Sequence, residues 1–587
     1  MAPQSSSRRR RSGKAPPAAP TASAAPAPAG RGPLQWIARQ PVELWRTFSG
    51  LGLVIGALFF AAALTPSLIP RAPLLQGVLS GVCFAIGYGI GVLLLAAWEW
   101  MQLPLANVRV RRNATWAAAA VALAVVLRFL WKSAEWQNSI RERMGMPLLE
   151  GAEPFTVALV ALVVFVLLLL VARSFRGVGG MVRRWLARYV PERVSMLVGG
   201  LAAAALFWTL VDGVLFDGFI RLSDRSFQAL DALMEPQFPA PTEPARTGSA
   251  ESLVSWEELG RAGREFVVSG PTAEQIAAFT GRPAKQPIRV YAGLNSAEEL
   301  DDRARLVLDE MIRAGAFDRK VLIVVVPTGT GWMDPAAMDT LEYLHDGDTA
   351  IVAMQYSYLT SWISLLVEPG YGSAAGRELF RAVYRHWTEL PEDARPKLYL
   401  QGLSLGSYGS EQSFRVHEVM ADPFQGAVWS GPPFPSPLWG GATRERNPGS
   451  PEWLPTYGDG SIIRFTNQEN HLDVPGAEWG PMRIVFLQYA SDPITFFDPH
   501  SVWHKPDWMT PPLGPDVSPE LRWYPVVTFL QLGLDMAIAL AVPIGHGHYY
   551  APEHYIDAWV AVTDPPGWTP EEVGRLKRHF IEARAGG

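Results

Sequence analysis

A serine flanked by glycines is the first group in this sequence that could do chemistry. The pentapeptide GLSLG, from Gly402 to Gly406, follows a predicted strand at Lys397–Gln401 and precedes a predicted helix at Ser407–Met420. A tight turn between a strand and a helix exposes the serine hydroxyl, and the glycines let neighbouring backbone approach it closely. This context favours Ser404 as a nucleophile over an ordinary strand–helix turn.

A serine hydroxyl needs a base, and the base needs a group that orients it. In enzymes with this turn the chain order is serine, acid, histidine. Asp492 follows a predicted strand at Met482–Gln488 and is the preferred acid, with Asp498 in reserve and an Asp-Pro turn residue as the plain alternative. The later segment GHGHYY offers His546 and His548, each after a glycine. We prefer His548 as the base, and His546 stays open.

An oxyanion hole is the third requirement of such a site. Its first donor should be the backbone N–H of Leu405, and the second should come from the loop after an early strand. Gly329, Thr330 and Gly331 follow a predicted strand at Lys320–Val326. A phosphate-binding loop is the rival interpretation, but the segment lacks the Gly-Lys-Ser/Thr ending of that motif.

A metal site is the main alternative chemistry for the histidines. His500 and His504 together with the later pair could supply imidazole ligands, but there is no His-Glu-x-x-His motif and no cysteine in this half of the chain. The one cysteine, Cys83, lies in an apolar run, which is typical of a small core residue, and it excludes an intramolecular disulfide. We therefore expect no metal and no other cofactor.

The elements that must position these residues are short apolar runs that alternate with helical stretches from about residue 286 to 587. Near-continuous apolar strands in this arrangement predict a mostly parallel sheet with helices on both faces. A Pro-, Trp- and Gly-rich insertion at about 431–481 predicts a lid. Its Trp439, Trp453 and Trp479 would line an entrance or serve packing alone. The further predicted strands are Ile288–Tyr291, Thr349–Gln355 and Gly426–Trp429, and the further predicted helices are Ala273–Phe279, Ala297–Ala314 (capped by Ser296) and Ala374–Thr388.

The first part of the chain has a different composition. Residues 1–45 are rich in Ala, Pro and Arg and predict a disordered basic tail, whereas residues 46–220 contain about five apolar runs that predict transmembrane helices. Residues 221–285 are a polar connector. The third run contains Arg128, which must face the bundle interior or snorkel. The runs are Leu51–Leu68, Leu75–Trp98, Trp116–Trp131, Phe155–Val171 and Val194–Phe216.

The charges of the loops predict an orientation in the membrane. The tail and alternate loops carry most of the arginines, while the intervening loops carry only Arg71, Lys132, Arg141 and Arg143. This bias places the N-terminus in the cytoplasm, so that five spans would put the C-terminal domain outside it. If the third run does not span, this orientation inverts.

Composition narrows the partners. Of the 587 residues, 49% are hydrophobic and only 18% are charged, which indicates membrane content, and the length indicates at least two domains. A net charge of -5 gives no basic surface for nucleic acid. The expected partners are the lipid bilayer and a lipid or acyl-ester substrate. The sequence indicates no oligomeric state.

With these residues in place, the chain resembles a bacterial membrane-anchored α/β-hydrolase family. The motifs that carry the resemblance are Pro327–Trp332, Gly402–Gly406, Gly545–Tyr550, Asp557–Trp559 and Pro565–Trp568. The resemblance implies an all-α transmembrane domain followed by an α/β-hydrolase domain, located at the bacterial cytoplasmic membrane. Some relatives are thought to hydrolyse aminoacyl phospholipids, so that substrate is implied only by the resemblance.

Three functions therefore remain open on the sequence. The first is a serine ester hydrolase that acts on a lipid or lipid-linked ester at the outer face of the membrane. The second is a non-catalytic membrane scaffold or transport component that keeps a hydrolase-like domain. The third is a serine peptidase or acyltransferase with the same residues, because the choice of acceptor depends on the shape of the pocket.

Overall fold

The computed structural model describes residues 48–104, 107–151, 153–209, 231, 233–235, 237–359, 364 and 370–586. The predicted disordered tail at 1–45 and much of the connector lie outside these residues. Gly50–Gly587 forms one compact unit that contains both the apolar helices and the sheet.

A seven-stranded parallel sheet is the centre of the C-terminal part, in the order β1-β3-β2-β4-β5-β7-β6. Six of the strands occur where the sequence predicts them, and the fold class is confirmed. The seventh, β6, lies inside the segment predicted as a lid and was missed because it has only four residues. The strands are β1 (Ile288–Ala292), β2 (Val321–Val326), β3 (Thr349–Met354), β4 (Lys397–Leu403), β5 (Gly426–Ser430), β6 (Ile463–Thr466) and β7 (Arg483–Leu487).

The apolar runs are continuous because both faces of the sheet are buried. In β2, Leu322, Val324 and Val326 pack into one core cluster, while Val321 and Ile323 pack into the other. Alternate side chains of a strand point to opposite faces, so a strand covered on both sides needs apolar residues at every position.

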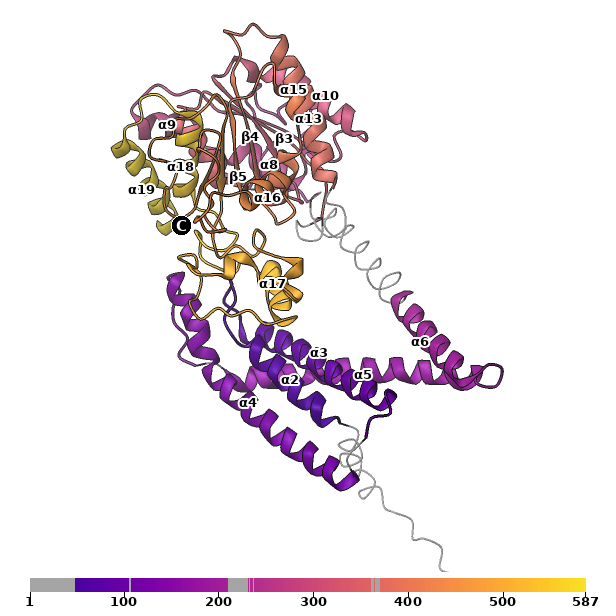
Figure 1. Cartoon of the computed structure of the whole chain (residues 1–587). Helices are drawn as coiled ribbons and strands as arrows, with labels where there is room; N and C mark the ends of the chain where they lie inside the picture. The colour runs from indigo at the N-terminus through magenta and orange to yellow at the C-terminus, as the bar shows by residue number, and fades with distance from the viewer. Residues whose placement is uncertain are drawn as a thin grey trace, which may run out of the picture. The chain divides into compact units, whose positions relative to one another are not determined.

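Helices cover the two faces as the crossover rule for parallel strands requires. Helices α10 (Leu300–Ala314), α13 (Gly370–Glu389) and α14 (Leu405–Glu411) contact one face, and α8 (Gly260–Ser269) and α18 (Pro552–Thr563) contact the other. Figure 1 shows α10 and α13 on one side of the strands and α18 on the opposite side. The remaining helices of this part are α9 (Ala273–Thr280), α11 (Pro335–Leu344), α15 (Val416–Val419), α16 (Pro437–Arg444), α17 (Val527–Ala537) and α19 (Pro570–Gly586).

Two helix predictions differ from the structure in their ends. The predicted cap Ser296 is wrong, because α10 begins at Leu300 with Glu299 at its N-cap, and the Ser296 hydroxyl donates instead to the carbonyl of Glu258. The single helix predicted at Ser407–Met420 is broken into α14 and α15, with a turn between them.

The N-terminal part contains α2 (Gly50–Ala63), α3 (Pro73–Trp100), α4 (Val108–Arg143), α5 (Pro154–Leu186) and α6 (Glu192–Trp208). Three of these helices, α3, α4 and α5, are long and apolar enough to cross a membrane. Helix α2 has 14 residues and ends before the predicted run does. A buried loop with two prolines follows it, and proline removes the N–H that would extend a helix. The end of the fifth predicted run, from residue 210 on, lies outside the described residues.

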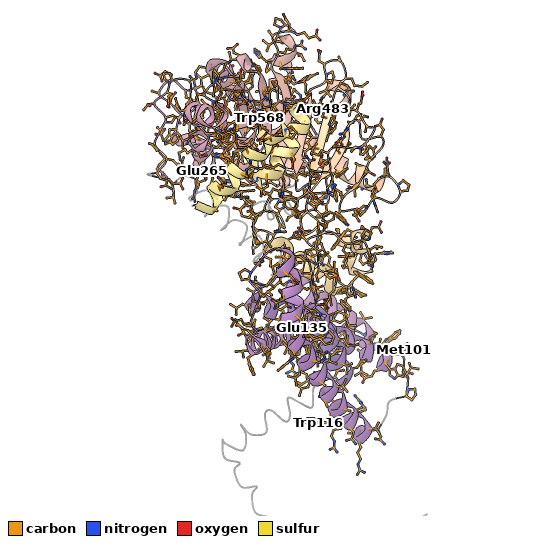
Figure 2. All side chains as sticks on the ribbon, turned by 90° about the vertical axis from the view of Figure 1, so that its left-hand side faces the viewer. Met101, Trp116, Glu135, Glu265, Arg483 and Trp568 are labelled. Atoms are coloured by element: carbon orange, nitrogen blue, oxygen red, sulfur yellow. The ribbon has the colours of Figure 1, made fainter. Side chains whose placement is uncertain are left out.

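The surfaces of these helices are apolar where a soluble helix would be polar. Leu93 of α3 is 68% exposed and Leu159 of α5 is 63% exposed. Exposed side chains line α3 and α4 in Figure 2, including Met101 just after α3 and Trp116 on α4. Arg128 is exposed and so does not face the bundle interior, which leaves snorkelling as its route to water. Large exposed apolar surfaces of this kind indicate association with a membrane.

Candidate active site

The candidate site lies at the carboxyl edge of the sheet, where ligands of parallel α/β sheets bind. Strands β2, β4, β5 and β7 are neighbours in the sheet. The loops that follow them therefore meet at one edge, and these loops carry the predicted oxyanion segment, Ser404, Gly431 and Asp492.

Ser404 joins β4 to α14 in a strained backbone conformation, with φ 57° and ψ −127°. A non-glycine residue rarely adopts positive φ, and such strain is concentrated at functional sites. Its N–H donates to the carbonyl of Ser430 over 2.9 Å. The flanking glycines make the turn possible: a Cβ on Gly402 would lie 2.3 Å from the Gly406 oxygen, and one on Gly406 would lie 2.2 Å from the Val326 oxygen.

Asp492 and His548 lie side by side although 56 residues separate them. The Nδ1 atom of His548 is 2.7 Å from Oδ2 of Asp492. The other carboxylate oxygen accepts the N–H of Ile494 over 2.8 Å, and the hydroxyl of Tyr550 donates to Oδ2 over 2.7 Å. The Asp492 side chain is fully buried, so these bonds replace the water that an ionised carboxylate requires.

The free edge of the His548 ring is poised for a proton. Its Nε2 atom is buried and has no hydrogen-bond partner among the described residues. The backbone N–H of His548 donates to the carbonyl of Ala539 over 3.1 Å, which fixes the residue. On the next strand, a Cβ at Gly431 would lie 2.6 Å from Cε1 of the ring, so only glycine fits beside it. Gly431 follows Ser430, whose carbonyl binds the Ser404 N–H.

His546 has a looser arrangement. Its Nδ1 atom lies 3.6 Å from Oδ2 of Asp516 and makes no hydrogen bond among the described residues. The reserve acid, Asp498, caps a short helix through the N–H of His500 and interacts with the His500 ring over 3.1 Å. The structure thus brings together His548 and Asp492, and it leaves His546 and Asp498 in other surroundings. No group of three or more His, Cys, Asp or Glu side chains suited to a metal occurs in the part of the chain that the structure describes.

The segment after β2 forms a closed turn beside the serine. The N–H of Gly331 donates to the carbonyl of Thr328 over 2.9 Å, so this predicted oxyanion donor is already engaged. The carbonyl of Gly331 accepts the Tyr291 hydroxyl over 2.9 Å. Leu405 is the first residue of α14, and N–H groups of a first turn have no partner within the helix. Gly406 lies against the end of β2, which brings this turn next to Leu405.

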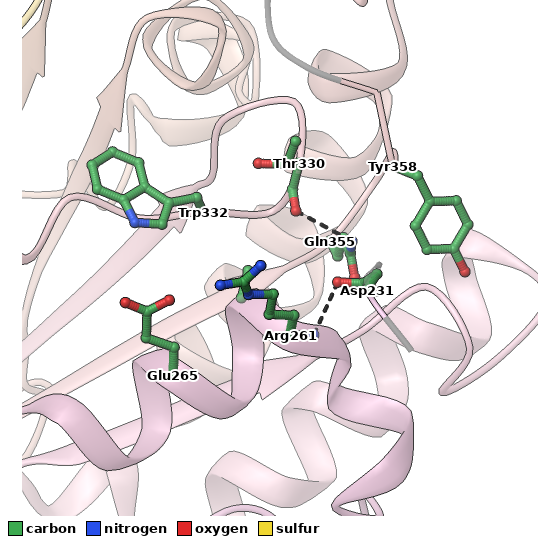
Figure 3. A pocket seen from close by; sticks show the side chains of 8 residues that line it. Asp231, Arg261, Glu265, Thr330, Trp332, Gln355 and Tyr358 are labelled. Atoms are coloured by element: carbon green, nitrogen blue, oxygen red, sulfur yellow. Dashed lines mark hydrogen bonds between the residues drawn. The ribbon is translucent and has the colours of Figure 1, made fainter. Parts of the chain in front are cut away.

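Thr330 faces away from this turn, into a side cavity of 360 Å³. Figure 3 shows Thr330 and Trp332 across from Arg261 and Glu265. The carbonyl of Thr330 accepts from Nε2 of Gln355 over 3.3 Å. The turn is therefore braced on its outer side by β3 and its following residue.

Two family comparisons match these two parts of the chain. A model described as an alpha/beta-hydrolase family matches residues 288–576, and one described as the N-terminus of the same family matches residues 64–271. The chain belongs to this α/β-hydrolase family. No curated protein and no solved structure matched the chain.

In this hydrolase a polar network that the sequence did not reveal supports the histidine loop. The N–H of Gly547 donates to Ser491 over 2.8 Å, and the Ser491 hydroxyl donates to Asp516 over 2.5 Å. Gln468 donates both to Asp516 and to the carbonyl of Gly545. Only Ser491, next to Asp492, carried a local signal, because the other partners are distant in sequence.

A further carboxylate of the hydrolase domain, Asp334, was also missed. It caps α11 through the N–H of Ala336 over 3.0 Å and is hydrogen-bonded to Tyr555. The Tyr555 hydroxyl lies 2.7 Å from that of Ser430. Burial raises the pKa of Asp334 to about 7, and His548 is close enough to oppose that shift. The position before Pro335 at a helix start was its only sequence signal.

The tryptophans of the predicted lid make packing contacts. Nε1 of Trp439 donates to Gln488 over 2.6 Å, and Nε1 of Trp453 donates to the carbonyl of Pro512. Trp479 lies under the guanidinium of Arg464, 3.9 Å from the ring centre. The contacts of these three residues are therefore those of the packing alternative.

Proposed function

We propose that this hydrolase is a serine ester hydrolase in which Ser404 is the nucleophile, His548 the base and Asp492 the group that orients the base. The observation that carries the proposal is the pair of Asp492 and His548, with the unpartnered Nε2 atom at the edge that holds the strained serine. The contacts of His548 favour it over His546.

The chemistry follows from the proton positions. With Asp492 accepting at Nδ1, the neutral His548 ring carries its proton there, and its Nε2 lone pair accepts the proton of Ser404 Oγ. The serine oxygen then attacks the ester carbonyl, and His548 returns the proton to the leaving alcohol as the C–O bond breaks. Water attacks the resulting acyl-serine by the same route, which releases the acid and restores the enzyme.

The negative charge that develops on the carbonyl oxygen needs fixed donors. The N–H of Leu405 at the start of α14 is the proposed first donor, aided by the positive end of the helix dipole. The second would come from the turn Pro327–Trp332, in which the Gly331 N–H is already engaged. Gly329 and Thr330 are the remaining candidates.

An amphiphilic substrate is supported by two observations. Helices α3, α4 and α5 are apolar enough to hold the enzyme in a bilayer, and tethering raises the local concentration of lipids at the site. A cavity of 670 Å³ next to the acid loop has Phe434 and Phe497 on its wall and Arg444 and Lys505 at its edge. The proposed substrate is therefore a lipid or lipid-linked ester, and the family resemblance suggests an aminoacyl phospholipid as a specific candidate.

The proposed location is a bacterial cytoplasmic membrane, with the hydrolase domain outside the cytoplasm. The distribution of arginines among the loops supports this orientation. Helix α4 qualifies as a span, which supports the odd number of crossings that this orientation requires.

Labelling of intact spheroplasts with a membrane-impermeant fluorophosphonate tests both parts of the proposal. We expect labelling of the wild type and none of Ser404→Ala at equal expression. Ser407→Ala, a buried serine of the same helix turn, is the matched control and should keep the label. Labelling only after lysis would invert the orientation. Absence of labelling before and after lysis would contradict the hydrolase proposal and favour a non-catalytic scaffold.

Separate assays distinguish the possible acceptors. Release of free acid from an aminoacyl or acyl lipid in detergent-free membranes is the result expected of an ester hydrolase. Transfer of the acyl group to an added alcohol, or cleavage of a peptide with esters left intact, would instead identify an acyltransferase or a peptidase.

A further inference from the structure

The loop between α2 and α3 is buried to an extent unusual for a connection. Every residue from Leu64 to Arg71, named here the buried loop, is buried, although connecting segments normally run over the surface. Leu68 and Ile69 are fully buried and belong to the same core cluster as the sheet of the hydrolase domain. The buried loop is therefore packed as part of the catalytic domain.

A buried ion pair fixes this loop to α17. Nε and a terminal nitrogen of Arg71 donate to Oδ1 of Asp535 over 3.0 and 2.9 Å, and both side chains have no exposed surface. The N–H of Leu68 donates to Oδ2 of Asp535 over 3.1 Å. Nε2 of Gln531, one turn earlier on α17, donates to the carbonyl of Thr65 over 3.0 Å. Since an uncompensated buried charge is unfavourable, these bonds hold the loop and the helix in one arrangement.

The end of α17 leads directly to His548. The carbonyl of Ala539, four residues after Asp535, accepts the backbone N–H of His548 over 3.1 Å. The same carbonyl and the side chain of Val542 lie against Gly547. The position of the histidine backbone is thus set by the segment that the ion pair anchors.

The buried loop also reaches the histidine loop directly. The Cδ1 atom of Ile69 would lie 3.1 Å from a Cβ placed on Gly547, so the isoleucine packs against the residue before His548. Gly547 has φ 56° and donates its N–H to Ser491, so it has little freedom to adjust. Two separate contacts, Ile69 with Gly547 and Arg71 with Asp535, therefore link this loop to the histidine.

We propose that the buried loop Leu64–Arg71 positions His548, so that α2 and α3 complete the support of the active site. Ile69 and Arg71 act as positioning residues through Gly547 and Asp535, and neither touches the substrate. This inference rests on the proposed function of His548 as the base. It implies that the hydrolase domain depends for its activity on the helices that precede it.

The test compares two buried isoleucines in the full-length protein in its membrane. Ile69 lies behind the histidine loop, and Ile276 on α9 is equally buried but packs in the other core cluster. The readouts are the second-order rate constant for labelling of Ser404 by a small fluorophosphonate, per folded molecule, and the thermal midpoint.

We expect Ile69→Ala to slow labelling by about 10- to 100-fold, because small displacements of a catalytic group have effects of this size. Ile276→Ala should lower the thermal midpoint similarly but leave the rate constant unchanged. Ile69→Val should restore most of the rate, and Asp535→Asn, which leaves Arg71 unpaired, should slow labelling as well.

Each outcome bears on one claim. If Ile69→Ala and Ile276→Ala lose label only in proportion to folded protein, the buried loop does not position His548 and the inference is overturned, while the proposed function stands. Wild-type protein without any Ser404-dependent label would overturn the proposed function and, with it, the role assigned to His548.

Discussion

Two histidines of the same loop, His546 and His548, each lie beside a carboxylate, but the two pairs differ in every physical respect. His548 and Asp492 are in hydrogen-bond contact at 2.7 Å, and the side chain of His548 is only 10% exposed. His546 and Asp516 are 3.6 Å apart, and the His546 side chain is 21% exposed. A short, buried and oriented contact suits proton transfer, whereas the longer one fits a role in shaping the loop.

The two carboxylates explain this difference. Asp492 uses one oxygen for the N–H of Ile494 and offers the other to His548 and Tyr550. Asp516 uses its Oδ2 atom for Ser491 and Gln468, which leaves His546 at a distance. One carboxylate thus orients a ring, and the other holds backbone in place.

The largest expected effect comes from removing each ring in turn. His548→Ala should lower ester turnover by roughly 10³- to 10⁵-fold, because loss of a general base leaves only binding and the oxyanion hole. His546→Ala should stay within about tenfold, since its ring makes no hydrogen bond among the described residues. Turnover of a small soluble ester by purified protein measures both. The opposite ranking would exchange the roles of the two histidines.

The next effect separates the two carboxylates. Asp492→Asn should lower turnover by roughly 10³- to 10⁴-fold, because an amide no longer selects the tautomer with the proton on Nδ1. Asp516→Asn changes the network that holds Gly547 through Ser491, and we expect a loss of about tenfold or less. The same assay applies, with thermal midpoints as the control for folding. Equal losses in the two variants would show that support of the loop matters as much as the orientation of the ring.

A smaller effect is expected from the second partner of Asp492. Tyr550→Phe removes the hydroxyl that donates to Oδ2, the oxygen that also contacts His548. We expect turnover to fall by about tenfold or less, the scale of one hydrogen bond to a charged group. Tyr549→Phe, at the exposed neighbouring position, is the matched control. A loss as large as that of Asp492→Asn would mean that the tyrosine, and not the imidazole alone, fixes the carboxylate.

The smallest effect concerns Asp334, the third carboxylate near His548. Its pKa rises from 3.8 to about 7 by burial, so the folded state holds this proton more tightly than the unfolded chain between these values. Its contribution to stability is fully present below about pH 4 and is lost as the pH rises to 7, with a slope of at most about 1.4 kcal/mol per pH unit.

Asp334→Asn keeps an acceptor for the helix cap and removes this titration. We expect the variant to become more stable relative to wild type as the pH rises from 5 to 8, as measured by thermal midpoints at each pH. A constant difference between the two proteins over this range would show that Asp334 does not retain its proton in the folded state.

Local sequence patterns determined most of the fold. Six strands, the turn at Ser404 and the apolar helices were predictable because each depends on residues close together in the chain: apolar runs for buried strands, glycines for a tight turn, length and hydrophobicity for a span. Strand β6 escaped prediction because four residues carry too little pattern, and Ser296 was misassigned as a cap because several polar residues near a helix start can serve.

Only the tertiary structure decided which histidine faces which acid. His546 and His548 have nearly the same local sequence, and their partners Asp516 and Asp492 come from separate loops. The ion pair of Arg71 with Asp535 joins residues 464 positions apart. No periodicity or motif encodes such contacts, because they arise only when the sheet and the buried loop have packed against each other and burial makes each polar partner obligatory.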